Sequence, residues 1–159
     1  MTDQKTTEAA GQEGPVFRLQ KMYVKDLSFE NPNAPEVFFV QQAEPKVDFK
    51  LGIKNRKMDE DNWEVTMAIT ATITDTKSTK TYFIMEIEHA AIFLLKNIPE
   101  QHLAGVLNVE CPTLLFPFTR QIVSQISVDG GFIPFLMEPV NFLALYQGSL
   151  AQQQKKAEN

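Results

Sequence analysis

Apolar and polar residues alternate from Trp63 to Thr74, and no other feature constrains the fold of this chain as strongly. The apolar positions share one parity and the positions between them are mostly threonine: Trp63, Val65, Met67, Ile69, Ala71 and Ile73 against Glu64, Thr66, Ala68, Thr70, Thr72 and Thr74. Successive side chains of a strand point to opposite faces, so this pattern predicts a strand with one buried face and one wet face. A sheet with one wet face is typically antiparallel.

Three other segments also have strand patterns. The apolar residues expected on one face of the first segment, although Lys21 and Lys25 interrupt that face, are Phe17, Leu19, Tyr23 and Leu27. Those of the second, which alternate with charged residues, are Val47, Phe49, Leu51 and Ile53. The last strand covers roughly Thr81–Phe93. Turns at 59–62 and 77–79 join the last three strands, whereas a Pro-containing crossover, 31–44, joins the first two, so we expect a four-stranded antiparallel sheet.

The hydrophobic period becomes helical after Phe93. Pro99 is typical of a helix start. Pro112 restarts the chain, and a second helix either starts near Pro117 or is kinked there. It ends before Gly130, an apolar loop follows over 132–139, and a final helix begins at about residue 141 with Phe142, Leu145 and Tyr146 on one side. Strands followed by helices indicate an α+β fold with helices packed on one face of the sheet.

Length and composition indicate one domain without covalent cross-links. We expect residues 1–14 to be disordered, 15–151 to form the domain and 152–159 to be a flexible tail. Cys111 is the only cysteine, which suits the cytoplasm. The net charge of −5 and pI of about 5.1 argue against nucleic acid. No apolar run approaches the ~20 residues that membrane insertion needs.

No motif indicates an enzyme, a metal site or a cofactor. His89 and His102 have no potential ligands at metal-binding spacing, and Cys111 has no basic neighbour that would activate its thiol. The Gly130–Gly131 pair is interpreted as a helix stop. Glu86 and Glu88 share one face of a strand, which favours a docking patch over acid–base chemistry.

The second half of the chain is unusually apolar. Between Cys111 and Tyr146 the only charged residues are Arg120, Asp129 and Glu138. A helix that is apolar around most of its circumference must be covered on several sides, and one sheet covers only one. This excess predicts a subunit interface, an exposed groove for apolar segments of other polypeptides, or both.

Three motifs then resemble one known family. These are Tyr23–Pro35 (YVKDLSFENPNAP), Cys111–Arg120 (CPTLLFPFTR) and Pro139–Phe142 (PVNF), and the chain is similar to the SecB protein-export chaperones from about Phe17 to Gln152. The resemblance implies a cytoplasmic homotetramer, a dimer of dimers, that works without ATP. Such a chaperone binds unfolded precursor polypeptides, keeps them competent for translocation and delivers them to the SecA ATPase.

The resemblance also implies two sets of site residues. The family's SecA contact corresponds here to Asp26, Glu30, Ile84 and Glu86. The client-binding groove of the family corresponds to segments that contain Phe38, Phe39, Val47, Phe49, Leu51, Phe132, Phe135, Leu136 and Met137, although any of these residues could instead fill the core. The crossover lacks a tryptophan that some members carry. The tail has Lys155 and Lys156 where an acidic end is familiar, so the resemblance transfers no tail contact with SecA to this chain.

Two other functions remain open from the sequence. One is a SecB-like chaperone of a toxin–antitoxin module, since fold and groove would be shared. The other is a carrier of small apolar ligands, with the helices closing over one face of the sheet. An enzyme is a more distant alternative.

Overall fold

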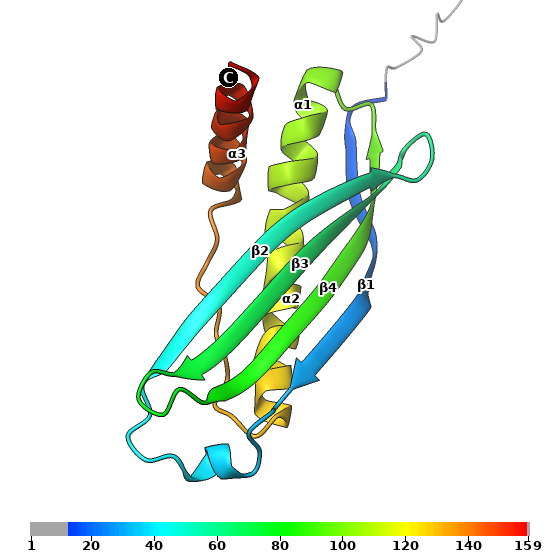
Figure 1. Cartoon of the computed structure of the whole chain (residues 1–159). Helices are drawn as coiled ribbons and strands as arrows, with labels where there is room; N and C mark the ends of the chain where they lie inside the picture. Colours follow the sequence, from blue (N-terminus) through cyan, green and yellow to red (C-terminus); the bar gives the residue numbers. More distant parts are fainter. Residues whose placement is uncertain (1–12, 159) are drawn as a thin grey trace, which may run out of the picture.

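The computed structural model describes residues 13–158, in which a four-stranded sheet is covered by helices on one face (Figure 1). The strands are β1 (Val16–Glu30), β2 (Pro45–Lys57), β3 (Asn62–Asp75) and β4 (Thr81–Lys96). They pair antiparallel in the order β1-β4-β3-β2, so the crossover carries the chain from one edge of the sheet to the other. It contains one short 3-10 helix, η1 (Glu36–Phe39), which the sequence pattern did not predict. The predicted antiparallel sheet with helices on one face is confirmed.

Strand β1 contains two irregularities that correct the predicted assignment of its faces. The pairing with β4 shifts register between Leu19 and Lys21 and again between Val24 and Asp26. Each shift adds one residue and reverses the alternation that follows. The residues placed on the helix-covered face are therefore Phe17, Leu19, Met22, Val24, Leu27 and Phe29. Tyr23, predicted on that face, lies on the wet face instead.

The first two predicted helices form one continuous rod. It consists of α1 (Glu100–Gly105), a π-helical turn η2 (Val106–Glu110) and α2 (Cys111–Asp129). In the π turn the Cys111 N–H donates to the Val106 carbonyl, five residues back. Pro112 follows this turn in the first positions of α2, where its missing N–H is tolerated. The rod therefore continues through Pro112 without a break. Pro117 also lies inside α2.

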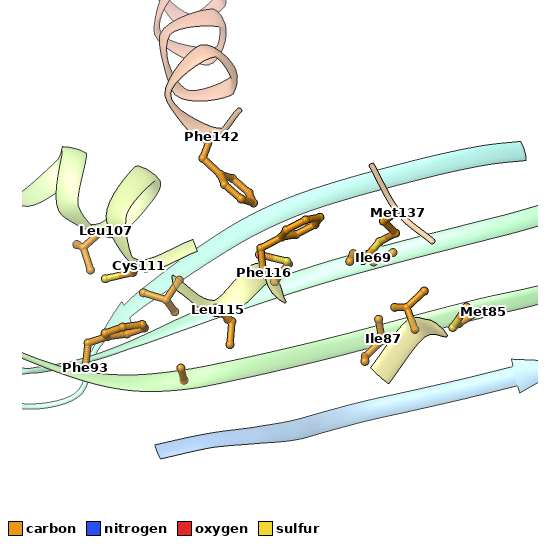
Figure 2. Packing of buried hydrophobic residues seen from close by; sticks show 14 of the residues in the cluster. Ile69, Met85, Ile87, Phe93, Leu107, Cys111, Leu115, Phe116, Met137 and Phe142 are labelled. Carbon is orange, nitrogen blue, oxygen red and sulfur yellow. The ribbon is translucent and has the colours of Figure 1, made fainter. Parts of the chain in front are cut away.

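The core lies between the rod and the middle of the sheet. Rod helix α2 contacts β3 and β4, and its residues Cys111, Leu115 and Val123 are fully buried. The sheet side is formed by the odd-numbered residues of β3 and β4, among them Met67, Ile69, Met85, Ile87 and Phe93. Figure 2 shows Phe116 of α2 between the sheet and Phe142, whose ring centroid is 5.7 Å away. Complete burial of one such side chain stabilises by about 1.5–3 kcal/mol.

The last helix, α3 (Phe142–Ala157), begins where the sequence predicts. The Asn141 side chain caps it by accepting a hydrogen bond from the Ala144 N–H, 3.0 Å away. The helix continues through residues 152–157, which belong to the predicted flexible tail, 152–159. A helical conformation does not report flexibility, so the flexibility of this tail stays a prediction.

The predicted N-terminal segment lies mostly outside the described residues. Of it, Glu13 forms an ion pair with Lys96 at 3.0 Å. Among residues 13–158, no helix combines the length and the apolar character needed to span a bilayer.

Candidate functional site

An open apolar cavity of about 530 Å³ lies at the end of the sheet where the crossover leads into β2. It is bounded by the crossover, by residues 131–136 and by the ends of β3 and β4. Its wall is mostly aromatic and aliphatic: Val37, Phe38, Val40, Ala43, Pro45, Val47, Ile73, Tyr82, Phe83, Gly131, Phe132, Ile133, Pro134, Phe135 and Leu136. We call this site the Phe-lined cavity. A surface of this kind favours apolar ligands with little selection for shape.

The cavity brings together five of the nine residues predicted to bind clients. They are Phe38, Val47, Phe132, Phe135 and Leu136. Phe39 is outside the wall and 80% exposed on η1, and Phe49 is partly exposed farther along β2. Met137 is buried in the core, so its side chain is inaccessible without movement of the chain. Leu51 lines a second cleft.

That second cleft, about 230 Å³, lies between β2 and α3. It is lined by Leu51, Ile53, Asn108, Phe142, Leu145, Tyr146 and Ser149. Leu51 and Ile53 lie on the same face of β2 as Val47, so the apolar face of this strand connects the two hollows. We call this site the α3 cleft.

Phe132 is the central aromatic of the Phe-lined cavity. Its ring centroid lies 5.0 Å from that of Phe83 and 5.3 Å from that of Phe38. Sequence patterning did not identify Phe83 or Tyr82 as wall residues, because the alternation of β4 does not reveal how far the helices cover the strand. Ile133, another wall residue that was not predicted, is 86% exposed.

The crossover is fastened to the sheet by Asp75 at the end of β3. The buried Asp75 carboxylate accepts hydrogen bonds from the Glu44 N–H at 2.8 Å and the Ser78 N–H at 2.7 Å, and from the Ser78 hydroxyl. These bonds, the Ser78 hydroxyl first, lower the pKa of Asp75 to about 2. Lys77 pairs with Glu44 at 2.9 Å on the surface. The charged form of Asp75 thus holds one end of the cavity wall.

The wet face of the sheet collects the residues predicted to contact SecA. In the β1–β4 register Glu30 lies opposite Ile84, Ser28 opposite Glu86, and Asp26 opposite Glu88. Asp26, Glu30 and Glu86 are exposed, and Ile84 is half-buried between the strands. Asp26, Glu30, Glu86 and Glu88 form what we call the acidic band. Glu88 was not among the predicted contacts, and it pairs with Lys54 of β2 at 3.3 Å.

A buried carboxylate on the same face organises the basic residues beside this band. Glu64 accepts a hydrogen bond from the Tyr23 hydroxyl, and Lys25 and Arg56 pair with its other oxygen at 3.1 and 3.3 Å. The hydrogen bond from Tyr23 is the main cause that lowers the pKa of Glu64. Burial and this bond raise the pKa of Tyr23 to about 12. The register shift in β1 places Tyr23 here.

His89 and Cys111, whose side chains are of types that often act in catalysis, are both buried in the core. His89 is 3% exposed, its Nδ1 lies 2.8 Å from Thr119 Oγ1, and burial lowers its pKa. Cys111 is fully buried, which raises the pKa of its thiol to about 12, with a smaller contribution from Glu110. Among residues 13–158, no three His, Cys, Asp or Glu side chains are grouped so that they could hold a metal ion.

A comparison with known families identifies the family of the chain. The family model described as preprotein translocase subunit SecB matches residues 10–153. This chain belongs to the SecB family. A protein-export protein SecB from Desulfotalea psychrophila is 62% identical over 145 residues, which cover 91% of this chain and 93% of that protein. Another from Magnetococcus marinus is 41% identical over 151 residues, covering 95% and 94%. These relatives confirm the resemblance found in the three sequence motifs and support the role of a protein-export chaperone.

A solved structure shares the fold. It is a SecB-like chaperone from Mycobacterium tuberculosis in complex with a peptide from an antitoxin, with a TM-score of 0.60 and 15% sequence identity. The match covers 78% of this chain and 90% of that chain. At this identity the similarity concerns the α+β fold, and SecB membership rests on the more similar sequences.

Proposed function

We propose that this SecB-family chain is an ATP-independent chaperone that captures unfolded precursors of exported proteins in the cytoplasm and delivers them to SecA. The observation that carries the proposal is the Phe-lined cavity. An unfolded precursor exposes apolar segments of many shapes, and an open aromatic wall accepts such segments without strict shape selection. Burial of these segments keeps them from folding or aggregating. No catalytic group or cofactor takes part.

Two exposed side chains of the cavity wall, Ile133 and Leu136, together with Phe39, which follows the wall residue Phe38 in the sequence, make this proposal testable without disturbing the core. Phe39, Ile133 and Leu136 are 80%, 86% and 61% exposed, so their loss removes apolar contact area for a client at little cost in stability. The triple variant Phe39→Ser, Ile133→Ser, Leu136→Ser is expected to fold and to lose most of its ability to delay refolding of a denatured precursor. Leu150→Ser, an exposed leucine of α3, is the matched control.

Refolding is followed by the recovery of the precursor's own fluorescence, with the chaperone in excess and no nucleotide present. The proposal is wrong if the native chain leaves the rate of refolding unchanged. If the triple variant and the Leu150 control both act like the native chain, capture occurs elsewhere than at the Phe-lined cavity.

Delivery to SecA is proposed to use the wet face. Asp26, Glu30 and Glu86 place three exposed carboxylates on two adjacent strands, on the face opposite the helices, and Ile84 lies directly across from Glu30. A rim of like charge attracts a basic partner and mainly raises the rate of association, which suits a reversible encounter. Because the cavity is at one end of the other face, a client and SecA could be bound together.

Charge reversal separates these two surfaces. Replacement of Asp26, Glu30 and Glu86 by Lys is expected to weaken SecA binding by at least tenfold at low salt, with client capture unchanged. The matched control replaces three exposed acids away from the band, Glu60, Glu138 and Glu158. Binding is measured by surface plasmon resonance. Loss of client capture together with SecA binding would instead assign a structural role to the three acids.

Assembly as a dimer of dimers is proposed from apolar side chains that the described chain leaves uncovered. Phe17, Val24 and Leu27 of β1 and Leu114 and Phe118 of α2 are each 37–43% exposed. Those of β1 lie on the helix-covered face at the free edge of the sheet. Native mass spectrometry is expected to show a tetramer, and a monomer at micromolar concentration would contradict this assembly.

Two alternative functions are a chaperone of a toxin–antitoxin module and a carrier of small apolar ligands. The carrier can be distinguished from the export chaperone with the same purified protein. Lipid bound in stoichiometric amount after purification, with no effect on precursor refolding, would favour the carrier. The sequence identity to protein-export proteins favours the export role over the toxin–antitoxin role.

A further inference from the structure

A hollow of mixed charge lies on the wet face of the sheet, beside the acidic band. It has a volume of about 350 Å³, and its lining includes Lys25, Lys54, Arg56, Glu64, Thr66 and Glu88. Glu88 belongs both to this lining and to the acidic band, so the two surfaces are continuous, and it pairs with Lys54 at 3.3 Å. We call this site the basic hollow, because its three cations outnumber its two acids.

Buried Glu64 brings two of the three cations to one point. Lys25 and Arg56 both pair with its Oε1 oxygen, at 3.1 and 3.3 Å, while the Tyr23 hydroxyl donates to Oε2. Both oxygens of this carboxylate are therefore occupied from within the chain. An ammonium group has three N–H donors and a guanidinium group has five, so Lys25 and Arg56 keep donors for a further acceptor.

Thr66 supplies an uncharged donor in the same hollow. It is 5% exposed and lies opposite Lys54 in the β2–β3 register. The hydrogen bonds of the surrounding side chains are accepted by Glu64 and Glu88, and they leave the Thr66 hydroxyl without a partner in residues 13–158. A nearly buried hydroxyl without a partner is costly, so an acceptor that enters the hollow gains a hydrogen bond there. A hydroxyl beside cations suits a carboxylate, which accepts charge-assisted hydrogen bonds.

We propose that the basic hollow binds a carboxylate of the same polypeptide that places its basic residues on the acidic band. The inference rests on the proposed delivery to SecA, and it adds an acidic residue of the partner to that contact. Lys54, Arg56 and Thr66 hold the carboxylate. Two adjoining contacts of opposite sign fix the orientation of the partner on the sheet, which a band of one sign leaves open.

The neighbouring charges decide which class of anion the hollow takes. The four carboxylates of the acidic band and the net charge of −5 repel a phosphate-rich surface, which carries many negative charges. A single carboxylate on a basic polypeptide is instead brought to the hollow by the cations that the band attracts. The three cations and two acids of the hollow leave one positive charge, which one carboxylate neutralises.

Neutral variants of the hollow test the inference by the direction of their effect. Lys54→Gln combined with Arg56→Gln removes two cations beside the acidic band. If negative charge alone attracted the partner, this change would strengthen SecA binding. We expect instead that binding becomes about 3- to 30-fold weaker at about 50 mM salt, because the carboxylate of the partner loses its donors. Surface plasmon resonance measures the affinity.

The matched control is Lys46→Gln combined with Lys50→Gln. It makes the same change of charge on the same face of β2, outside the hollow, and should leave SecA binding unchanged or slightly stronger. Thr66→Val removes the hydroxyl without a change of charge and should weaken SecA binding about 2- to 10-fold. Thr70→Val, on the same face of β3 but outside the hollow, should leave it unchanged. Capture of a denatured precursor should be unchanged in all four variants.

The possible failures of the inference and of the proposed function are distinguishable. Stronger SecA binding in the Lys54 and Arg56 variant, or an equal change in this variant and its control, overturns the carboxylate site and leaves delivery to SecA intact. A loss of precursor capture together with SecA binding assigns a structural role to the hollow and also overturns the site. If the native chain binds no SecA, both the delivery to SecA and the carboxylate site are wrong.

Discussion

His89 Nδ1 and Thr119 Oγ1 lie 2.8 Å apart in the core and join strand β4 to helix α2. Thr119 Oγ1 is also 3.3 Å from the Leu115 carbonyl. When the hydroxyl donates to that carbonyl, His89 Nδ1–H donates to the hydroxyl oxygen, so both polar groups are satisfied without water. Both residues are almost completely buried.

Replacing Thr119 by Val keeps the shape of the side chain and removes the partner of His89. A buried polar group left without a hydrogen bond costs about 1–3 kcal/mol, so the free energy of unfolding should fall by that amount. Thr113→Val is the control, because Thr113 is exposed on the same helix, and its effect should stay within about 0.5 kcal/mol. Urea denaturation at one fixed protein concentration measures both. Equal effects of the two variants would contradict a specific role of the His89–Thr119 bond.

Acid should destabilise the fold through His89. Burial lowers the pKa of His89 in the folded chain below its ordinary value of 6.5, so the neutral form is favoured there. Its contribution to stability is present above the unfolded pKa and is lost as the pH falls through the folded pKa. The free energy of unfolding of the native chain should therefore decrease from about pH 7 to pH 5, and less so in His89→Gln. His102→Gln, at an exposed position of α1, should retain the native pH dependence.

The Asp75 carboxylate should hold the crossover only while it is charged. Its pKa is lowered from 3.8 to about 2 by the hydrogen bonds it accepts, so its contribution to stability is present above about pH 4 and is lost as the pH falls toward 2. Asp75→Asn should be less stable than the native chain at neutral pH, and its crossover amides should exchange hydrogen faster. The difference in stability should vanish near pH 2. Asp48→Asn, on the exposed face of β2, should change neither property at neutral pH.

Cys111 should resist thiol reagents in the native chain. The thiol is fully buried and its pKa is raised to about 12 from an ordinary value of 9.0, which lowers the thiolate fraction near pH 8 about a thousandfold. Iodoacetamide should modify it rapidly in denaturant and at least a thousandfold more slowly in the native chain, as measured by intact mass. Similar rates under both conditions would show that α2 opens far more readily than its burial implies.

Gly131 should be required for the wall of the Phe-lined cavity. Its φ is +90°, and a Cβ at this position would lie 2.9 Å from two atoms of the Phe38 ring. Gly131→Ala should therefore lower the free energy of unfolding by about 1–2 kcal/mol and displace Phe38. Gly148→Ala is the control, since a Cβ there meets nothing within 4 Å, and it should stabilise α3 by up to about 1 kcal/mol. Thermal denaturation compares the two variants.

The class of fold and the number of strands could be predicted because their signals are local. The alternation of β3 from Trp63 to Thr74 appears in the structure as a strand buried on its odd-numbered side. The start of α3 was likewise visible, because Asn141 caps the helix with its own side chain.

The errors occurred where distant contacts decide the conformation. Tyr23 was placed on the apolar face because periodicity assumes a regular strand. In the folded chain, register shifts against β4 turn it to Glu64, a residue 41 positions away. Pro112 was expected to separate two helices, but a π turn before it lets the helix continue.

The sequence by itself determined the antiparallel sheet, the helical second half and, through three motifs, the SecB family. Only the tertiary structure decided how the predicted site residues are distributed: Phe38 and Phe132 together at the Phe-lined cavity, Met137 in the core, and the acidic band opposite the helices. Side-chain periodicity reports which face of its own element a residue occupies. Which other element covers that face depends on strand order and register, and those follow from contacts between residues far apart in the chain.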